Sequence, residues 1–163
     1  MSYYPAFLAL EGRTTVVVGG GAVAESKVES LLVTGATVRV IAPAVTERLR
    51  ELAGEGRIEW SQRPHATGDL AGAFMAISAT GDPAVDSEVA CEARERGVLV
   101  NVVDDPQRSD FIAAAVLRRG DLVVAVSTSG AAPAVAARIR DRLASEFGRE
   151  WQVALELLRA VRG

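Results

Sequence analysis

Cysteine and histidine are nearly absent from this 163-residue sequence. The single cysteine, Cys91, has no partner for an internal disulfide, and its place in an expected helix favours a small buried apolar residue. The single histidine, His65, has no partner for a His-based zinc site, and its position beside Pro64 favours a surface loop. We therefore expect no disulfide framework and no metal site.

An excess of positive charge and a long apolar run are also missing. The formal net charge is -3, so no bulk electrostatic attraction to nucleic acid is expected. No apolar stretch approaches the length that crosses a bilayer, and Met1–Pro5 lacks the basic start of a secretory signal. We expect a cytoplasmic protein that binds neither nucleic acid nor membrane. A hydrophobic content of 49% permits one full-sized core plus an appendage.

The most informative stretch is Thr14–Lys27, in which three valines precede three glycines. Consecutive valines are typical of a strand buried on both faces, and the residues after the glycines have helical spacing. Within it, Gly19-x-Gly21-x-x-Ala24 has the G-x-G-x-x-G/A form of a dinucleotide-binding fingerprint. Gly19 allows a tight turn, Gly21 allows a pyrophosphate to approach, and the helix N-terminus offers unpaired N–H groups. Taken alone, the glycines would favour a flexible strand-to-helix turn.

The context of the glycines favours the dinucleotide interpretation, because a second strand, Thr37–Ile41, closes a βαβ unit. One part of the fingerprint is missing. The acidic residue expected about twenty residues on is replaced by Ala42-Pro43. The motif therefore leaves the choice between NAD and NADP open, and Arg39 keeps NADP conceivable.

Strands and helices continue to alternate as far as residue 103. We expect strands over 57–61, 73–79 and 98–103, and helices over 22–34 and 45–53. A third helix is expected to be capped by Thr80 or Asp82 and to end at Gly97. This alternation predicts an α/β fold with a Rossmann-like, doubly wound parallel sheet. The apolar segment Ala6–Leu10 is expected to form either an extra edge strand or a lid.

The pattern changes after residue 110. Phe111–Leu117 and Leu122–Val126 resemble the two strands of a hairpin, and two amphipathic helices, 133–147 and 151–161, follow. A hairpin with two helices is too small to form its own core. This small α+β segment must therefore pack on the first domain or on a second copy of itself.

Three groups of residues are candidates for chemistry. Ligands of open parallel sheets bind outside the carboxyl ends of the strands, where the glycine loop, Ser78–Thr80 and Asp104 are expected. A carboxylate at that edge would lie close to a nicotinamide, but Asp104 or Asp105 could equally cap the Asp-Pro turn. Ser127–Ser129 either caps a helix or hydrogen-bonds a carboxylated ligand; without a histidine at a suitable spacing, a triad hydrolase is not expected.

Several blocks together resemble the N-terminal module of siroheme synthases, the precorrin-2 dehydrogenases and their bifunctional dehydrogenase/ferrochelatase relatives. These blocks are Tyr4–Phe7, Val17–Lys27, Val40–Pro43, Ala76–Thr80, Asn101–Pro106 and Val124–Gly130, with Pro133 and Ala136–Arg138 after them. The missing acidic residue after the second strand is also a trait of this family. Its members usually carry a longer helical C-terminal domain, which puts an iron-insertion step in doubt here.

The resemblance implies NAD-dependent oxidation of precorrin-2 to sirohydrochlorin by a homodimer. It implies a NAD-binding domain (1–110), a dimerisation segment (111–147) and the start of a helical domain (148–163). Iron insertion into sirohydrochlorin and a NAD(H)-sensing module without turnover are the alternatives. The implied catalytic residue is Asp104; the implied cofactor-binding residues are Gly19, Gly20, Gly21, Ala22, Val23, Ala42, Pro43, Ser78, Thr80 and Val102; and the implied substrate-binding residues are Asn101, Arg108, Ser127, Thr128 and Ser129.

Overall fold

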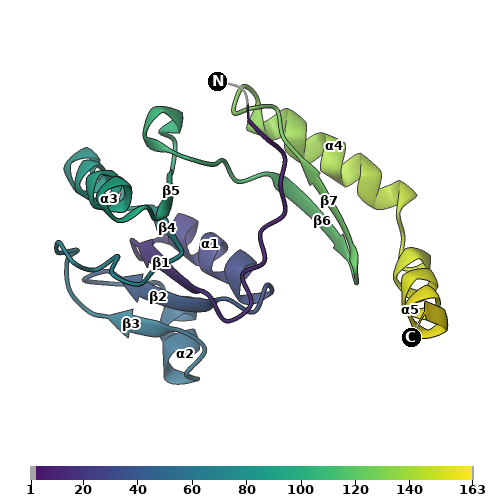
Figure 1. Cartoon of the computed structure of the whole chain (residues 1–163), viewed down its shortest axis with the longest axis horizontal. Coiled ribbons are helices and arrows are strands. Elements are labelled where there is room, and N and C mark those ends of the chain that lie inside the picture. Colours follow the sequence, from purple (N-terminus) through teal and green to yellow (C-terminus); the bar gives the residue numbers. More distant parts are fainter. Residues whose placement is uncertain (1–2, 163) are drawn as a thin grey trace. The chain divides into compact units, whose positions relative to one another are not determined.

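The structure, a computed structural model, describes residues 3–162 and divides into two compact units (Figure 1). The N-terminal unit comprises Tyr4–Phe111, and the C-terminal unit is built from residue 112 onward.

The N-terminal unit is built on a five-stranded parallel sheet with the order β3-β2-β1-β4-β5. Its strands are β1 (Thr14–Val18), β2 (Thr37–Ile41), β3 (Glu59–Ser61), β4 (Met75–Ser78) and β5 (Leu99–Val102). This is the Rossmann strand order 3-2-1-4-5-6 without its sixth strand, and the predicted fold class is confirmed. Since Val18 is paired with both Ile41 and Ser78, the carboxyl ends of the central strands lie at one edge of the sheet.

Helices cover the two faces of this sheet: α1 (Ala22–Leu32), α2 (Glu47–Gly54) and α3 (Pro83–Arg96). Neighbouring side chains of a strand point to opposite faces, so Val17 packs in one core cluster with residues of α1 and α2. Val16 and Val18 pack in the other cluster with residues of α3. The connection from β3 to β4, residues 62–74, contains no helix or strand, and we call it the crossover segment.

The C-terminal unit consists of an antiparallel hairpin and two helices. Its elements are β6 (Ala115–Arg119), β7 (Leu122–Val126), α4 (Pro133–Glu146) and α5 (Glu150–Arg162). The hairpin packs on α4, where Leu117 and Ala136 are the buried apolar residues. Within residues 3–162, no helix is both long and apolar enough to cross a membrane.

Four local expectations were wrong or only partly met. Residues 6–10 form no strand, and Phe7 is exposed. The first hairpin strand begins at Ala115 and not at Phe111, because Phe111 packs against the core of the N-terminal unit. Cys91 is exposed, since α3 turns Ala90 and Ala93 to the sheet instead. The side chain of His65 is only 1% exposed, so it is not a surface residue.

Candidate dinucleotide site

The glycine loop lies at the carboxyl end of β1, and its three glycines have different surroundings. A Cβ on Gly19, whose φ is +121°, would lie 2.3 Å from the carbonyl oxygen of Ala79. A Cβ on Gly20 would lie 2.0 Å from the carbonyl oxygen of Ala44. A Cβ on Gly21 would have no heavy atom within 4 Å. Packing therefore requires glycine at the first two positions, whereas Gly21 borders open space.

That open space lies at the N-terminus of α1. Gly21 is the N-cap residue of this helix and supplies no side-chain hydrogen bond to its first N–H groups. Unpaired N–H groups and the positive end of the helix dipole attract an anion such as a pyrophosphate. The residues present therefore fit the phosphate end of a dinucleotide.

A pocket of about 290 Å³ lies beside the loop. It brings together part of the predicted cofactor site, namely Gly19, Gly20, Ala42, Pro43 and Thr80. Pro64, His65, Asp82 and Val85 also line it, and local sequence gave no signal for the crossover residues among them. Ala22 and Val23 lie in the exposed first turn of α1, whereas Ser78 and Val102 are buried at strand ends.

The hydroxyl groups of Ser78 and Thr80 are engaged within the protein. They donate to Oδ1 of Asp86 in α3, at 2.6 Å from Ser78 and 2.7 Å from Thr80. Asp86 is only 9% exposed, and by accepting both hydrogen bonds its Oδ1 links α3 to the end of β4. Asp82, one of the two caps predicted for this helix, accepts a hydrogen bond from the N–H of Ala84. The role of Asp86 was not predicted from the sequence, because only its buried position next to Ser78 and Thr80 reveals it.

Asp104 follows β5 and has left-handed backbone geometry, with φ at +61°. Its side chain is exposed and accepts no hydrogen bond from any described residue. The turn is capped by Asp105 instead, whose Oδ1 accepts from the N–H groups of Gln107 (3.0 Å) and Arg108 (3.2 Å). Of the two carboxylates, Asp105 therefore caps the turn and Asp104 does not, and the positive φ of Asp104 lies in the left-handed region that aspartate adopts more readily than most residues.

The predicted substrate-binding residues lie in both units. In the N-terminal unit, Asn101 is buried and donates to the carbonyl oxygen of Phe111 at 3.0 Å, and Arg108 forms an ion pair with Asp105 at 2.6 Å. Both contacts hold the segment that follows β5. A substrate-binding role for these two residues stays a prediction.

The loop Ser127–Ser129 belongs to the C-terminal unit. Oγ of Ser127 accepts from the N–H of Ser129 at 3.0 Å, and Oγ1 of Thr128 accepts from the N–H of Ala132 at 3.0 Å. Ser129 has a φ of +55°, which places it in the left-handed region. Two of the three side chains therefore hold the loop that precedes α4, but no side chain caps this helix, so the capping alternative is not confirmed, and contact with substrate stays a prediction.

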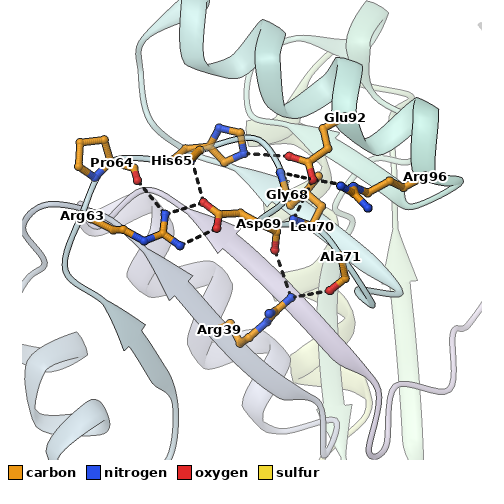
Figure 2. A network of polar contacts seen from close by, with 11 residues as sticks. Arg39, Arg63, Pro64, His65, Gly68, Asp69, Leu70, Ala71, Glu92 and Arg96 are labelled. Atoms are coloured by element: carbon orange, nitrogen blue, oxygen red, sulfur yellow. Dashed lines mark hydrogen bonds and ion pairs between the residues drawn. The ribbon is translucent and has the colours of Figure 1, made fainter.

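The crossover segment, which supplies Pro64 and His65 to the pocket, is held by a buried polar network (Figure 2). Oε1 of Glu92 in α3 accepts from the N–H groups of Gly68 (3.0 Å) and Leu70 (3.1 Å). The same oxygen accepts from Arg96 at 2.7 Å, and the other carboxylate oxygen lies 3.4 Å from Nε2 of His65. A segment without secondary structure is thereby fixed as one wall of the pocket.

The fold and the glycine loop define a dinucleotide-binding α/β domain. A family model described as "Putative NAD(P)-binding" matches residues 6–115, and the chain belongs to this family. A second model, "Sirohaem biosynthesis protein central", matches residues 119–146. The predicted dinucleotide cofactor and the predicted resemblance to siroheme synthases are both confirmed.

The chain is similar to several siroheme synthases. It is 44% identical to siroheme synthase 1 of Serratia proteamaculans over 143 residues, which cover 88% of this chain and 30% of the relative. It is 40% identical to the enzyme of Nitrosococcus oceani over 158 residues, which cover 94% of this chain and 34% of the relative. The chain thus spans about a third of the length of these relatives.

A solved structure titled "SirC, precorrin-2 dehydrogenase" matches nearly the whole chain. The TM-score is 0.84 at 29% identity, and the match covers 98% of this chain and 79% of that chain.

Proposed function

We propose that this chain is a NAD-dependent dehydrogenase that oxidises precorrin-2 to sirohydrochlorin. The similarity to a precorrin-2 dehydrogenase and to siroheme synthases supports the substrate. The observation that carries the proposal is Asp104, an exposed carboxylate without a hydrogen-bond donor, at the sheet edge that also holds the glycine loop. We further propose that residues 1–110 bind NAD, that 111–147 dimerise and 148–163 begin a helical domain, and that the homodimer acts in the cytoplasm.

The cofactor is proposed to lie with its pyrophosphate at Gly21 and its adenosine in the pocket. None of the described residues lining that pocket is a lysine or an arginine, whereas Asp82 contributes a carboxylate. A pocket of this charge suits the ribose hydroxyl of NAD better than the phosphate of NADP. Arg39 does not supply the missing charge, since Nη2 donates to the carbonyl oxygens of Asp69 and Ala71.

The oxidation removes a hydride and a proton from precorrin-2. When bound, NAD accepts the hydride. Asp104 is proposed to accept the proton on its carboxylate, which is exposed and accepts no other hydrogen bond from the described residues. A positioned base of this kind typically contributes about 10²–10⁴-fold to the rate.

The test is an anaerobic assay with precorrin-2 and NAD, followed by ferrous iron. The proposal predicts NADH and sirohydrochlorin in equal amounts before iron is added. Siroheme after the addition would favour the bifunctional alternative. If NAD binds but no NADH forms, the chain is a NAD(H)-sensing module, and the proposed reaction is wrong.

A further inference from the structure

One arginine lies next to the dinucleotide pocket without lining it. Arg63 follows β3, and the carbonyl oxygen of Ser61 accepts from the N–H of Ala42 at 3.2 Å. The start of the crossover segment thus lies beside Ala42, which lines the pocket. Pro64 and His65 follow Arg63 directly and line the pocket as well. A guanidinium in this position is well placed to approach a ligand at the end of β2.

Arg63 is instead bound by Asp69 from the same segment (Figure 2). Nη1 donates to Oδ2 at 2.8 Å and Nη2 donates to Oδ1 at 2.6 Å, which is the two-pronged geometry that arginine forms with carboxylates. Nη1 also donates to the carbonyl oxygen of Pro64 at 3.0 Å. The carboxylate of Asp69 is 11% exposed, and hydrogen bonding from Arg63 lowers its pKa below the ordinary value. The pair is therefore fully charged at neutral pH.

Bidentate pairing with an arginine is also how proteins bind the phosphate on the 2′ position of the NADP ribose. A guanidinium that donates both hydrogen bonds to Asp69 cannot donate them to a phosphate. Removing the carboxylate would free the two donor groups of Arg63 beside the end of β2, where the ribose of a Rossmann-bound dinucleotide lies.

We propose that Asp69 is a specificity-determining residue, which makes the site select NAD over NADP by holding Arg63 in an ion pair. This inference rests on the proposed binding of NAD in this pocket. Asp69 acts by keeping the guanidinium of Arg63 away from the ligand. It does not contact the ligand itself, because its carboxylate accepts hydrogen bonds from Arg63 and, at 2.8 Å, from the N–H of Ala66.

The segment does not depend on the Arg63–Asp69 pair alone. Arg39 donates to the carbonyl oxygens of Asp69 and Ala71, at 3.2 Å each. Glu92 holds the N–H groups of Gly68 and Leu70. In the Asp69→Asn variant an amide oxygen can still accept from Ala66, so we expect this variant to fold.

The test compares dissociation constants for NAD and NADP by isothermal titration calorimetry. We expect Asp69→Asn to bind NADP about fivefold or more tightly than the wild-type protein, since it gains charge-assisted hydrogen bonds, with NAD binding changed by less than about twofold. Arg63→Gln alone should leave both constants near wild type, and the double variant should lose the gain. Glu95→Gln removes the same charge from the exposed surface of α3 and serves as the matched control.

The outcomes separate this inference from the proposed function. A wild-type protein that binds no NAD at millimolar concentration contradicts the proposed function. Normal NAD binding without an NADP gain in Asp69→Asn, or a gain that persists without Arg63, contradicts the role of Asp69. An equal gain in Glu95→Gln would mean that net charge alone is responsible. If Asp69→Asn fails to fold, Asp69→Ser tests the same release of Arg63.

Discussion

Gly19, Gly20 and Gly21 are neighbours in sequence, but a methyl group would collide with the backbone at the first two and with nothing at the third. At Gly20 it would collide with the carbonyl oxygen of Ala44, at 2.0 Å. At Gly21 it would meet no protein atom within 4 Å, and the backbone there (φ -81°, ψ -175°) is open to any residue. The fold thus requires glycine at Gly20 but not at Gly21.

We therefore expect Gly21→Ala to fold normally but to bind NAD roughly tenfold or more weakly, a loss of about 1.4 kcal/mol, because the methyl group occupies the approach of the pyrophosphate. Gly20→Ala should instead lower the stability, by about 1–3 kcal/mol for an overpacked site. Urea unfolding and NAD titration of both variants check this pair. Unweakened NAD binding by a folded Gly21→Ala protein would mean that the phosphates lie elsewhere.

Single residues mark the limit of prediction from sequence. The glycine fingerprint could be identified because its spacing, and the strand and helix on either side of it, are local features of the sequence. The choice between Asp104 and Asp105 as turn cap stayed open, since adjacent aspartates differ only in backbone geometry. The burial of His65 was not predicted, because residues that lie near it, such as Glu92 in α3, are distant in sequence.

At the scale of elements, β2 was predicted to the residue, because an alternating β-branched run has clear limits. The predicted start of β6 was wrong, because an apolar run does not show which part of the molecule each of its residues packs against. Arg119 is paired with Leu122, so the short turn at Gly120-Asp121 and the end of β7 fix where β6 begins. Phe111 is apolar for another reason, since it packs against the core of the N-terminal unit.

The junction of β4 with α3 depends on Asp86, whose Oδ1 accepts from Ser78 and Thr80. We expect Asp86→Ala to lower the free energy of unfolding by about 2–3 kcal/mol, because two hydrogen bonds to a charged group are lost and the buried Ser78 hydroxyl is left unpaired. Asp82→Ala should cost only about 1 kcal/mol, the typical value of a helix N-cap. Urea denaturation of the two variants checks the order; equal losses would show that Asp86 contributes no more than a cap.

At the scale of the whole molecule, the C-terminal unit leaves many apolar side chains in solvent. Its exposed large apolar residues are Val135, Ile139, Trp151, Val153, Leu157, Leu158 and Val161, with Val116 on the hairpin. Val135 and Ile139 are four residues apart and therefore share one side of α4. Exposed apolar surface of this kind supports the proposed homodimer.

We expect the protein to be a dimer at micromolar concentration and Ile139→Glu to weaken the dimer, because a charge would be buried in an apolar contact. Arg138→Gln, at the adjacent exposed position, should leave the mass unchanged. Light scattering over a dilution series measures this. A stable wild-type monomer would refute the dimer.

The central claim is that Asp104 serves chemistry and not the fold. The most direct measurement is the rate of NADH formation from precorrin-2, under anaerobic conditions and saturating NAD, for wild type and Asp104→Asn. Asparagine tolerates a φ of +61° as well as aspartate does, so the fold and NAD binding should be unchanged. We predict a rate lower by about 10²–10⁴-fold, because the amide cannot accept the proton. An Asp104→Asn protein as fast as the wild type would contradict the claim.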